Sequence, residues 1–373
     1  MEYAKYKLGD IVTFLNGRAY LMPELQDSGK YRILRVGNLS GGNDSWYYSD
    51  MELDENKYCE KGDLLYAWAC NFGPHIWKEE KVIFHYHIWK LVEDKKKVDK
   101  TYLYYYLLHQ TPFYLGGVNG ATMVHITKKN MEKKTAYIPS SLEVQHRIAS
   151  ILSTYDTLIE NNTKRIRFLE KMAENLYKEW FVRFRFPGHE KVEMENGLPK
   201  GWSRGSLSEI CKFKRGKNIT SSEMIEGLVP VISAGLEPSG FHNEANVKGV
   251  SVTMSSSGAN AGYIAIHYSD IWAADCSYIE ESTTPYIYYV YELLNNIRGV
   301  ISNFQRGAAQ PHVYPKDINR IKMIIPSEDL RCLANERLSV IHKQIHNFEQ
   351  QNTLLARQRD LLLPRLMSGK LEV

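Results

Sequence analysis

The chain has 373 residues, of which 43% are hydrophobic and 24% are charged, and its formal net charge is +4. This composition predicts two or three soluble globular domains, and the small charge neither requires nor excludes a nucleic-acid partner. There is no run of about 18 apolar residues, no signal-peptide pattern and no CxxC pair among the five cysteines, so we expect a cytoplasmic protein with reduced thiols and no membrane span.

The first 140 residues mix strand-like and helix-like patterns, and we expect them to form one α/β domain. Short apolar segments bounded by glycine predict strands. The predicted strands lie within 6–17, 31–39, 62–68, 82–91 and 135–139. Apolar residues at helical spacing predict a helix over 101–109, and its tyrosines, Tyr102 to Tyr106, are expected in the core rather than stacked on bases.

Residues 141–186 are predicted to form one long helix. Its apolar or near-apolar residues recur at alternating spacings of four and three, which is typical of a coiled-coil seam. The two rows are Ile148, Tyr155, Asn162, Leu169 and Leu176, and Leu152, Ile159, Ile166, Ala173 and Trp180. At 1.5 Å per residue this helix is roughly 65 Å long, so we interpret it as a spacer that needs a partner helix.

The second half of the chain repeats the motifs of the first half. The segment from Leu8 to Gly17 matches the segment from Leu207 to Gly216. Further matches, each separated by 187 residues, are Lys61-Gly62 with Lys248-Gly249, Gly120 to His125 with Gly307 to His312, and Ile138-Pro139-Ser140 with Ile325-Pro326-Ser327. This order indicates an internal duplication.

The duplication includes a second long helix over 327–366, and Pro364 is expected to end or kink this helix. Its seam residues are Leu338, Ile345, Asn352, Arg359 and Leu366, and Ile341, Phe348, Leu355 and Leu362. If the two helices pair in antiparallel fashion, Asn162 and Asn352 lie near one another and fix the register. The alternative is that each asparagine faces solvent.

The predicted fold is therefore α+β, with two tandem-duplicated α/β domains separated by two long helices that pair as an antiparallel coiled coil. The predicted domain bounds are 1–140, 141–186 for the central helix, 187–201 for a linker, 202–326 and 327–373 for the C-terminal helix.

Four segments, together with the duplicated layout, resemble the DNA specificity subunit of type I restriction–modification systems. They are Gly307 to Val313 (GAAQPHV), Leu198 to Trp202 (LPKGW), Trp180 to Phe184 (WFVRF) and Leu362 to Leu371 (LLPRLMSGKL). The resemblance implies that each α/β unit is a target recognition domain for one half of a bipartite double-stranded DNA site. It implies that the helices set the gap between the halves and dock two modification methyltransferase subunits, through which restriction subunits join.

The resemblance also implies that this chain has no catalysis and binds no cofactor, with S-adenosylmethionine, ATP and Mg expected on the partner subunits. The sequence agrees, because it has no Asn-Pro-Pro-Tyr or Asp-Pro-Pro-Tyr segment and no GxxxxGK[ST] loop. The histidines His75, His85 and His87 with Cys70 fit no tight zinc spacing, so no metal is expected. The alternative is a coiled-coil scaffold that binds protein partners without DNA specificity.

Candidate DNA contacts are polar residues on loops, because Arg, Lys, Asn and Gln match base edges and phosphates. In the first unit they are Arg18, Asn71 and His75, with Asn119, Thr122 and His125 in a later loop. In the second unit they are Arg215, Lys217, Ser257, Asn260, Arg306, Gln310 and His312. For each residue, the alternative is a solvated or capping polar group.

Overall fold

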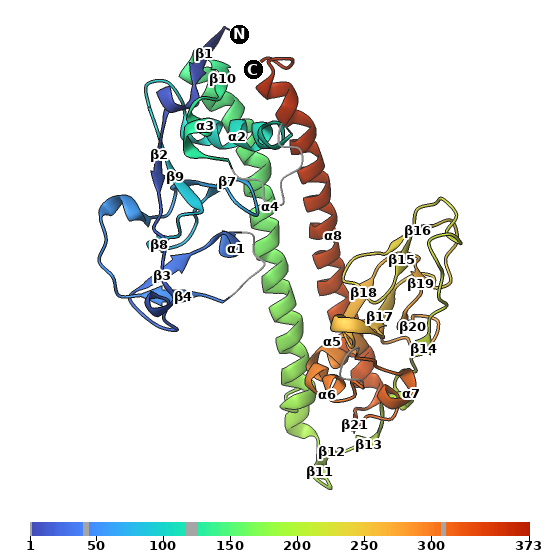
Figure 1. The fold of residues 1–373 in the computed structure, drawn as a ribbon. Helices are drawn as coiled ribbons and strands as arrows, with labels where there is room; N and C mark the ends of the chain where they lie inside the picture. Colours follow the sequence, from blue (N-terminus) through green and yellow to red (C-terminus); the bar gives the residue numbers. More distant parts are fainter. Residues whose placement is uncertain (1, 40–44, 117–125, 307–310) are drawn as a thin grey trace. The chain divides into compact units, whose positions relative to one another are not determined.

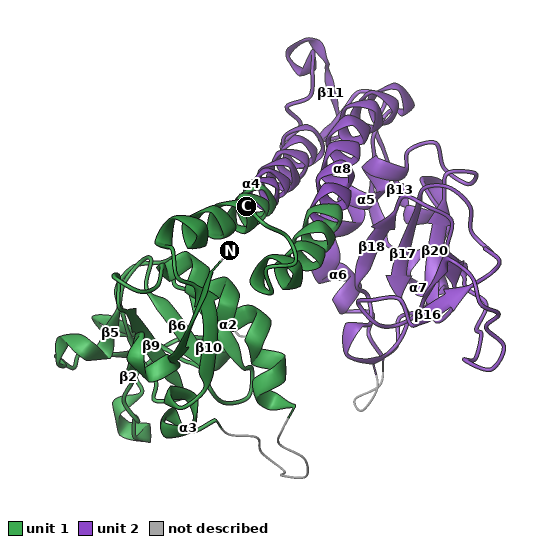
Figure 2. Ribbon diagram, turned by 90° about the horizontal axis from the view of Figure 1, so that it is seen from above, with its two compact units in different colours: residues 1–160, 353–373 green, residues 161–352 purple. Residues whose placement is uncertain are grey.

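The computed structural model describes residues 2–39, 45–116, 126–306 and 311–373 (Figure 1). The chain divides into two compact units (Figure 2). Unit 1 comprises residues 1–160 and 353–373, and unit 2 comprises residues 161–352. The long helices α4 (Leu142–Tyr177) and α8 (Glu328–Met367) each contribute residues to both units.

The described residues of unit 1 form two four-stranded sheets and one two-stranded sheet. Its strands are β1 (Tyr3–Lys7), β2 (Val12–Asn16), β3 (Tyr31–Leu34), β4 (Tyr47–Ser49), β5 (Tyr58–Cys59), β6 (Leu64–Ala67), β7 (Gly73–Ile76), β8 (Val82–Phe84), β9 (Ile88–Glu93) and β10 (Thr135–Pro139). The strand orders are β2-β9-β6-β7, β4-β3-β8-β5 and β1-β10. The helices are α1 (Val36–Leu39), α2 (Lys100–Leu115) and α3 (Lys128–Glu132).

Helix α2 lies in the core of unit 1. Its N-cap Asp99 accepts a hydrogen bond from the Tyr102 amide at 2.7 Å, which satisfies one of the otherwise unpaired donors of the first turn. Tyr102, Tyr105 and Tyr106 are no more than 3% exposed. The prediction that these tyrosines pack in the core is confirmed.

In its described residues, unit 2 repeats most of the sheet architecture of unit 1, but it has no counterpart of β5 and it has an additional hairpin of β11 (Met194–Glu195) and β12 (Leu198–Pro199). Its other strands are β13 (Ser203–Ser206), β14 (Lys214–Arg215), β15 (Val229–Ile232), β16 (Gly240–His242), β17 (Ser251–Ser255), β18 (Ile264–His267), β19 (Trp272–Ala273), β20 (Cys276–Glu280) and β21 (Lys322–Ile325). The orders β14-β20-β17-β18 and β13-β21 reproduce those of unit 1, and β16-β15-β19 corresponds to β4-β3-β8, with β15 parallel to β19 as β3 is parallel to β8. The helices are α5 (Ile287–Asn296), α6 (Arg298–Ser302) and α7 (Pro315–Ile318).

The duplicated glycines Gly17 and Gly216 occupy equivalent positions. A Cβ atom on Gly17 would lie 2.4 Å from the carbonyl oxygens of both Phe84 and His85, and one on Gly216 would lie 2.4 Å from the carbonyl oxygen of Ala274. In both units, therefore, the chain crosses directly over the end of the parallel strand, and only glycine fits there. The matched glycines of the sequence repeat have this steric cause.

Gly17→Ala is expected to destabilise the chain by roughly 1–3 kcal/mol or more, because the added methyl group overlaps two backbone oxygens that cannot move independently. Urea denaturation followed by circular dichroism measures the change. Gly116→Ala is the control, since the nearest atom to its new Cβ is 3.5 Å away and its φ of −65° suits alanine. Equal stability of the two variants would contradict the steric explanation.

A side-chain amide on each long helix, buried in Gln145 and half-buried in Asn335, fixes the α/β portion of its own unit. In unit 1, Gln145 accepts a hydrogen bond from the Asp99 amide at 2.8 Å and donates to the carbonyls of Lys97 and Pro139 at 3.0 and 2.8 Å. In unit 2, Asn335 accepts from the amides of Tyr288 and Tyr289 and donates to the Pro285 carbonyl. All partners of both amides are backbone atoms just before or at the start of α2 or α5, or at the end of β10.

Gln145→Ala is expected to destabilise unit 1 by about 2–4 kcal/mol, because it leaves buried backbone groups without partners. Glu143→Ala on the same helical turn removes only an exposed ion pair with Arg147 and should change the unfolding free energy by less than about 0.5 kcal/mol. Chemical denaturation of both variants checks the difference, and a loss of the same size in each would contradict it.

The long helices run antiparallel within each unit. In unit 2, Asn162 donates to Gln351 at 3.3 Å, Asn352 donates to Thr163 at 3.4 Å, and Arg337 lies 5.8 Å from the Trp180 ring. In unit 1, Arg359 forms an ion pair with Asp156 at 2.5 Å. Every seam residue predicted from the heptads is buried or half-buried. Asn162 is 6% exposed, and each asparagine bonds to the residue next to the other; their role in setting the register stays a prediction.

Four expectations about individual elements are wrong. Residues 82–91 form two strands, because β8 and β9 belong to different sheets and His85 to His87 turn between them. Residues 31–39 form β3 followed by α1. Helix α4 ends at Tyr177 and continues as a π-helical turn only to Val182. Helix α8 includes Pro364 and ends at Met367, so the helix does not end at this proline, and the kink expected there as the other outcome stays a prediction.

The end of the central helix has a packing cause. Phe184 has a left-handed φ of 58°, which turns the chain away from the helix axis. Phe181, Phe184 and Phe186 then surround the Trp202 ring at centroid distances of 6.1, 5.2 and 5.5 Å. The predicted linker, 187–201, contains the β11–β12 hairpin, whose turn residues Asn196 and Gly197 both have positive φ, as a two-residue hairpin turn requires.

Candidate nucleic-acid interface

Asp275 joins two of the predicted contact residues of unit 2. It directly precedes β20, and its carboxylate accepts from the Arg215 guanidinium and from the Ser257 hydroxyl. Arg215 comes from β14, the neighbour of β20, and Ser257 follows β17 on the other side of β20. The Arg215 side chain is 44% exposed and that of Asp275 is 31% exposed, so both are accessible to a ligand.

Arg306 and His312 extend the same group. Their backbones exchange two hydrogen bonds of 2.9 and 2.8 Å, and His312 also pairs with Ser257 in an antiparallel bridge. The Arg306 side chain is 61% exposed and forms an ion pair with Asp317 at 3.1 Å. The His312 ring stacks on Tyr314 with centroids 6.1 Å apart. Four of the residues predicted for unit 2, Arg215, Ser257, Arg306 and His312, are therefore brought together.

The other described candidates of unit 2 lie close to this group but have structural partners. Asn260 ends a 3₁₀ turn over Gly258–Asn260, and its side-chain amide donates to the Ala234 carbonyl at 3.5 Å. Lys217 lies over the Trp272 ring at 5.7 Å. Gln310 lies outside the described residues, as do Asn119, Thr122 and His125 of the first unit.

This arrangement can read base edges. A guanidinium donates to the O6 and N7 acceptors of guanine, a carboxylate accepts from the amino group of cytosine, and a hydroxyl does either. The Asp275 carboxylate beside Arg215 opposes a phosphate at the same point, because like charges repel. The exposed Arg306 is better placed to contact a phosphate, because its own carboxylate partner, Asp317, is only 10% exposed.

In unit 1, Arg18 forms an ion pair with the carboxylate of Glu24. Its guanidinium makes two parallel bonds to Glu24, of 2.9 and 2.7 Å, and lies 5.2 Å from the Tyr20 ring. The hydrogen bonds from Arg18 hold the pKa of the Glu24 carboxyl below its usual value. The pair fixes the loop that follows β2.

Asn71 and His75 occupy different positions around β7. Asn71 is exposed in the turn before this strand, whereas His75 is half-buried on the strand opposite Leu65. Burial lowers the pKa of His75, so its ring is neutral at pH 7 and is a weak phosphate ligand. Among the described residues, no hydrogen bond joins Asn71 or His75 to Arg18.

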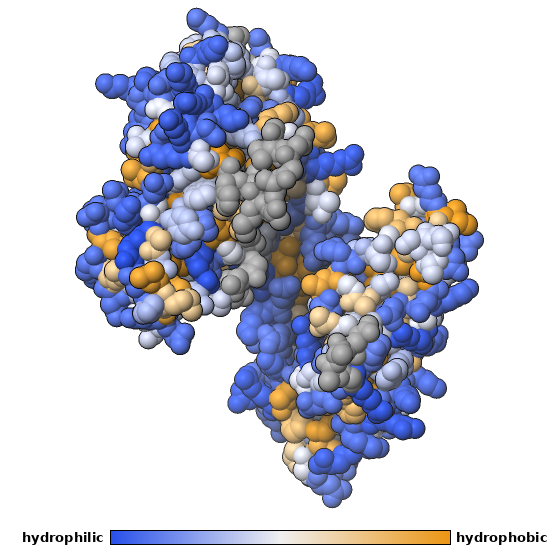
Figure 3. Space-filling model, in the orientation of Figure 1, coloured by the Kyte–Doolittle hydropathy of each residue, from blue (hydrophilic) through white to orange (hydrophobic). Residues whose placement is uncertain are grey.

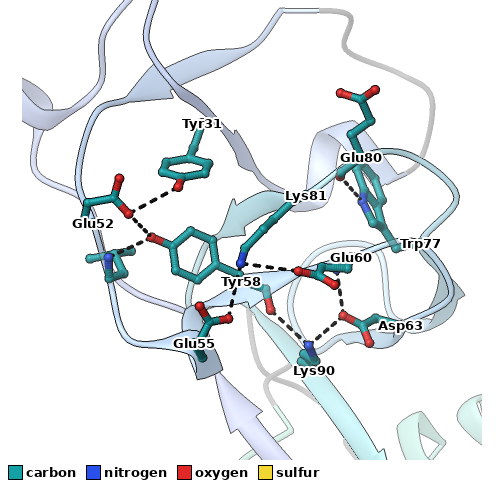
Figure 4. Close-up of polar contacts among 11 residues, drawn as sticks. Tyr31, Glu52, Glu55, Tyr58, Glu60, Asp63, Trp77, Glu80, Lys81 and Lys90 are labelled. Carbon is teal, nitrogen blue, oxygen red and sulfur yellow. Dashed lines mark hydrogen bonds and ion pairs between the residues drawn. The ribbon is translucent and has the colours of Figure 1, made fainter.

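A region rich in carboxylates marks the part of unit 1 that is unsuited to DNA (Figure 4). Around Tyr58, Lys81 reaches Glu55 and Glu60 at 3.3 Å each, and Lys90 lies 2.7 Å from Asp63. Both lysines are therefore neutralised within the protein. Acidic groups of this density repel phosphates, so we exclude this region from the candidate interface.

Sequence reasoning missed two features of these sites. Asp275 is a lone aspartate in the sequence, and only the paired strands bring Arg215 and Ser257 to it. The second feature is the ring cluster of Trp68, His85, Tyr86 and His87, of which the sequence pattern points only to the two histidines, as residues whose spacing does not suit zinc. Among the described residues, no group of three or more His, Cys, Asp or Glu side chains is arranged to hold a metal ion.

The visible face of the molecule is mostly hydrophilic, with separate apolar patches (Figure 3). Within the described part of the chain, no helix combines the length and the apolar character that crossing a membrane requires.

Comparison with known proteins identifies the family. The model of the type I restriction modification DNA specificity domain matches residues 1–171 and 199–359, one match for each repeat. The type I restriction enzyme MjaIX specificity subunit of Methanocaldococcus jannaschii is 28% identical over 309 residues, which cover 75% of this chain and 71% of the relative. The putative type I specificity subunit S.MpnORF638P of Mycoplasma pneumoniae is 25% identical over 371 residues, covering 98% and 96%.

The fold agrees with this assignment. The crystal structure of a type I restriction–modification S subunit from M. genitalium matches with a TM-score of 0.69 and 20% sequence identity, and the match covers 98% of this chain and 96% of that one. Because the family model matches both repeats and most of the chain, this protein belongs to the DNA specificity subunits of type I restriction–modification systems, which are the non-catalytic, sequence-recognising components of those enzymes.

Proposed function

We propose that unit 1 and unit 2 each read one half of a bipartite, asymmetric DNA site, and that the long helices dock two modification methyltransferase subunits, through which restriction subunits join. The observation that carries the proposal is a duplicated scaffold with different chemistry at the same position. Where unit 2 has Asp275 with Arg215 and Ser257, unit 1 has rings of histidine, tyrosine and tryptophan. Two copies of one fold with different contact chemistry suit two different half-sites.

In this proposal the chemistry takes place on the partners. S-adenosylmethionine binds the modification subunits, and ATP and Mg bind the restriction subunits. The recognition units of this chain select the adenine to be methylated, and their side chains supply base contacts and phosphate contacts without taking part in the transfer step.

The docking part of the proposal is supported by apolar residues outside the helix seams. On α4, Phe168 is 76% exposed and Met172 is 49% exposed, and their spacing of four places them on one face of the helix. On α8, Leu354 and Leu361 are 57% and 62% exposed, and their spacing of seven also places them on one face. Exposed apolar residues that share a helix face are suited to a protein partner.

The experiment mixes the full chain with the modification subunit of the same system and maps methylated adenines on a DNA library. Methylation at a split, asymmetric site is the expected result. If the mixture does not methylate and the chain does not retain DNA at low salt, DNA reading is contradicted. In that case, co-purification of the two proteins would favour a coiled-coil scaffold without DNA specificity.

Docking is tested with Phe168→Lys/Met172→Lys, which removes two exposed apolar side chains from unit 2. Binding of the modification subunit is expected to weaken at least tenfold, while DNA retention by the isolated chain stays unchanged. The control is Lys164→Ala, an exposed substitution on the same helix. Unchanged binding of the modification subunit by the double variant would exclude this face as the dock.

A further inference from the structure

The turn after β8 in unit 1 and the turn after β19 in unit 2 are the same element of the duplicated fold. Equivalent backbone hydrogen bonds establish the match. The His85 amide of unit 1 donates to the Leu34 carbonyl (2.9 Å), as the Ala274 amide of unit 2 donates to the Ile232 carbonyl (2.8 Å). Likewise, the Trp68 amide donates to the His87 carbonyl (3.1 Å), as the Ser256 amide donates to the Asp275 carbonyl (3.4 Å). His85 therefore corresponds to Ala274, and His87 corresponds to Asp275.

Unit 1 has one more residue in this turn. Three residues, 85–87, lie between β8 and β9, whereas two residues, 274 and 275, lie between β19 and β20. Since the outer positions correspond, the additional residue is Tyr86. Its side chain is among the exposed large side chains, at 38%. The insertion thus adds an exposed aromatic ring at the position where unit 2 has its Asp275 group.

The turn is held rigidly by neighbouring residues. The Trp68 indole donates to the Tyr86 carbonyl at 2.8 Å, and the Tyr86 amide donates to the Arg18 carbonyl at 3.0 Å. Trp68 also contacts the rings of Tyr86 and His87 at centroid distances of 6.0 and 5.1 Å. The cluster is therefore preorganised, so little conformational entropy is lost when it contacts a ligand.

The charge of this cluster is suited to bases rather than phosphates. Burial lowers the pKa of His85 to about 4, with smaller contributions from His87 and Arg35, so the His85 ring is neutral at pH 7. The guanidinium of Arg18, whose backbone carbonyl accepts from the Tyr86 amide, is bound to Glu24 through both of its terminal nitrogens. Aromatic faces stack on bases or contact the thymine methyl group, and neutral imidazoles donate or accept one hydrogen bond at a base edge.

We propose that the turn of His85, Tyr86 and His87, supported by Trp68, is the base-contacting element of unit 1 and determines part of its half-site. The inference rests on the proposed reading of DNA by unit 1. It assigns to this ring cluster the place that the Asp275 group has in unit 2. The contact is made to base faces and edges, so it contributes to specificity and little to the electrostatic part of binding.

The test compares Tyr86→Ala with Tyr137→Ala in the full chain assembled with its modification subunits. Tyr137 is the matched control, because it is a 55% exposed tyrosine of the same unit on strand β10, outside the cluster. Methylation rates on the cognate duplex and on duplexes with single base changes in each half give the discrimination of each unit. Tyr86→Phe, which keeps the ring, is the conservative variant.

Tyr86→Ala is expected to reduce discrimination by about tenfold or more at one or two positions of the unit 1 half-site, with the other half unchanged. The slope of log affinity against log salt should stay at its wild-type value, because no phosphate contact is lost. Tyr137→Ala should behave as the wild type does, and Tyr86→Phe, which keeps the ring, should recover most of the discrimination that Tyr86→Ala loses. His87→Gln provides a second variant in case Tyr86→Ala fails to fold, and it should relax the same half.

The inference is overturned if Tyr86→Ala and His87→Gln discriminate as well as Tyr137→Ala does, or if the salt slope falls by about one in either variant, which indicates a phosphate contact. Failure of the proposed function gives a different result, since the wild-type assembly then methylates no split site at all.

Discussion

A chimaera in which residues 1–140 come from another specificity subunit is expected to direct methylation to a site with one new half and one original half. The expected effect is a complete change of preference at the exchanged half, because each base contact there contributes about tenfold or more to discrimination. The half read by unit 2 and the gap between the halves should not change. Mapping of methylated adenines on genomic DNA determines the sequence of the exchanged half, the sequence of the original half and the length of the gap in one experiment.

The structure gives a reason to expect that the chimaera folds. Gln145 on α4 fixes the first α/β portion through three hydrogen bonds, and all of them go to backbone atoms. A donor unit with the same backbone offers the same partners whatever its side chains are. The apolar contacts between α4 and the exchanged portion depend on side-chain volume, because Ile148 and Leu152 share a core with α2. The donor therefore needs a helix of similar apolar volume in place of α2.

The reciprocal chimaera, with residues 202–326 exchanged, is the control. It should alter only the other half-site, since Asn335 anchors α5 through backbone atoms in the same manner. A change at both halves in either chimaera would contradict independent reading by the two units. Loss of methylation in a chimaera with a normal unfolding transition would contradict the backbone anchoring described above.

The periodic and repeated parts of this fold were predictable from the sequence. The heptad rows identify both long helices, because most residues are apolar where two helices pack, and all predicted seam positions are at least half-buried. The duplication was predictable from matched glycines, because Gly17 and Gly216 meet the same steric constraint. Such signals are strong because one physical requirement recurs many times along the chain.

The non-repeating parts were not predictable in the same way. The segment 82–91 is mostly apolar and aromatic, and the turn at His85 to His87 has neither glycine nor proline, so no turn signal in the sequence marks the change from one sheet to another. The end of α4 depends on Phe184 and on Trp202, which is separated from it by a hairpin. Both errors come from tertiary packing that overrides a local pattern.

For the site, the residue types were predictable and their partners were not. Arg215, Ser257, Arg306 and His312 were chosen as loop polar residues and do lie in one group, but the shared Asp275 comes from a strand end far along the chain. Arg18 satisfied the same criterion, and the structure pairs it with Glu24 six residues away. A single sequence does not distinguish a guanidinium that is bound within the protein from one that is available to DNA.

Insertion of seven residues into each long helix is expected to lengthen the unspecified gap between the half-sites. Seven residues preserve the heptad seam and add about 10.5 Å of helix, which corresponds to roughly three base pairs at 3.4 Å each. The insertions belong after Thr163 and before Gln351. In the antiparallel pair these points lie at the same level, because Asn352 bonds to Thr163 and Asn162 bonds to Gln351.

The insertions must be made in both helices, because each seam residue of α4 packs against a particular seam residue of α8. Seven residues added to α4 alone shift every seam residue after Thr163 against its partner and move Arg165 away from the Phe348 ring, which it now approaches to 5.5 Å. We therefore expect the single insertion to destabilise the helix pair and to abolish methylation, whereas the double insertion methylates a site with unchanged halves and a longer gap. If the double insertion methylates only the original spacing, the helices do not measure the gap, and the separation of the half-sites must be set elsewhere in the complex.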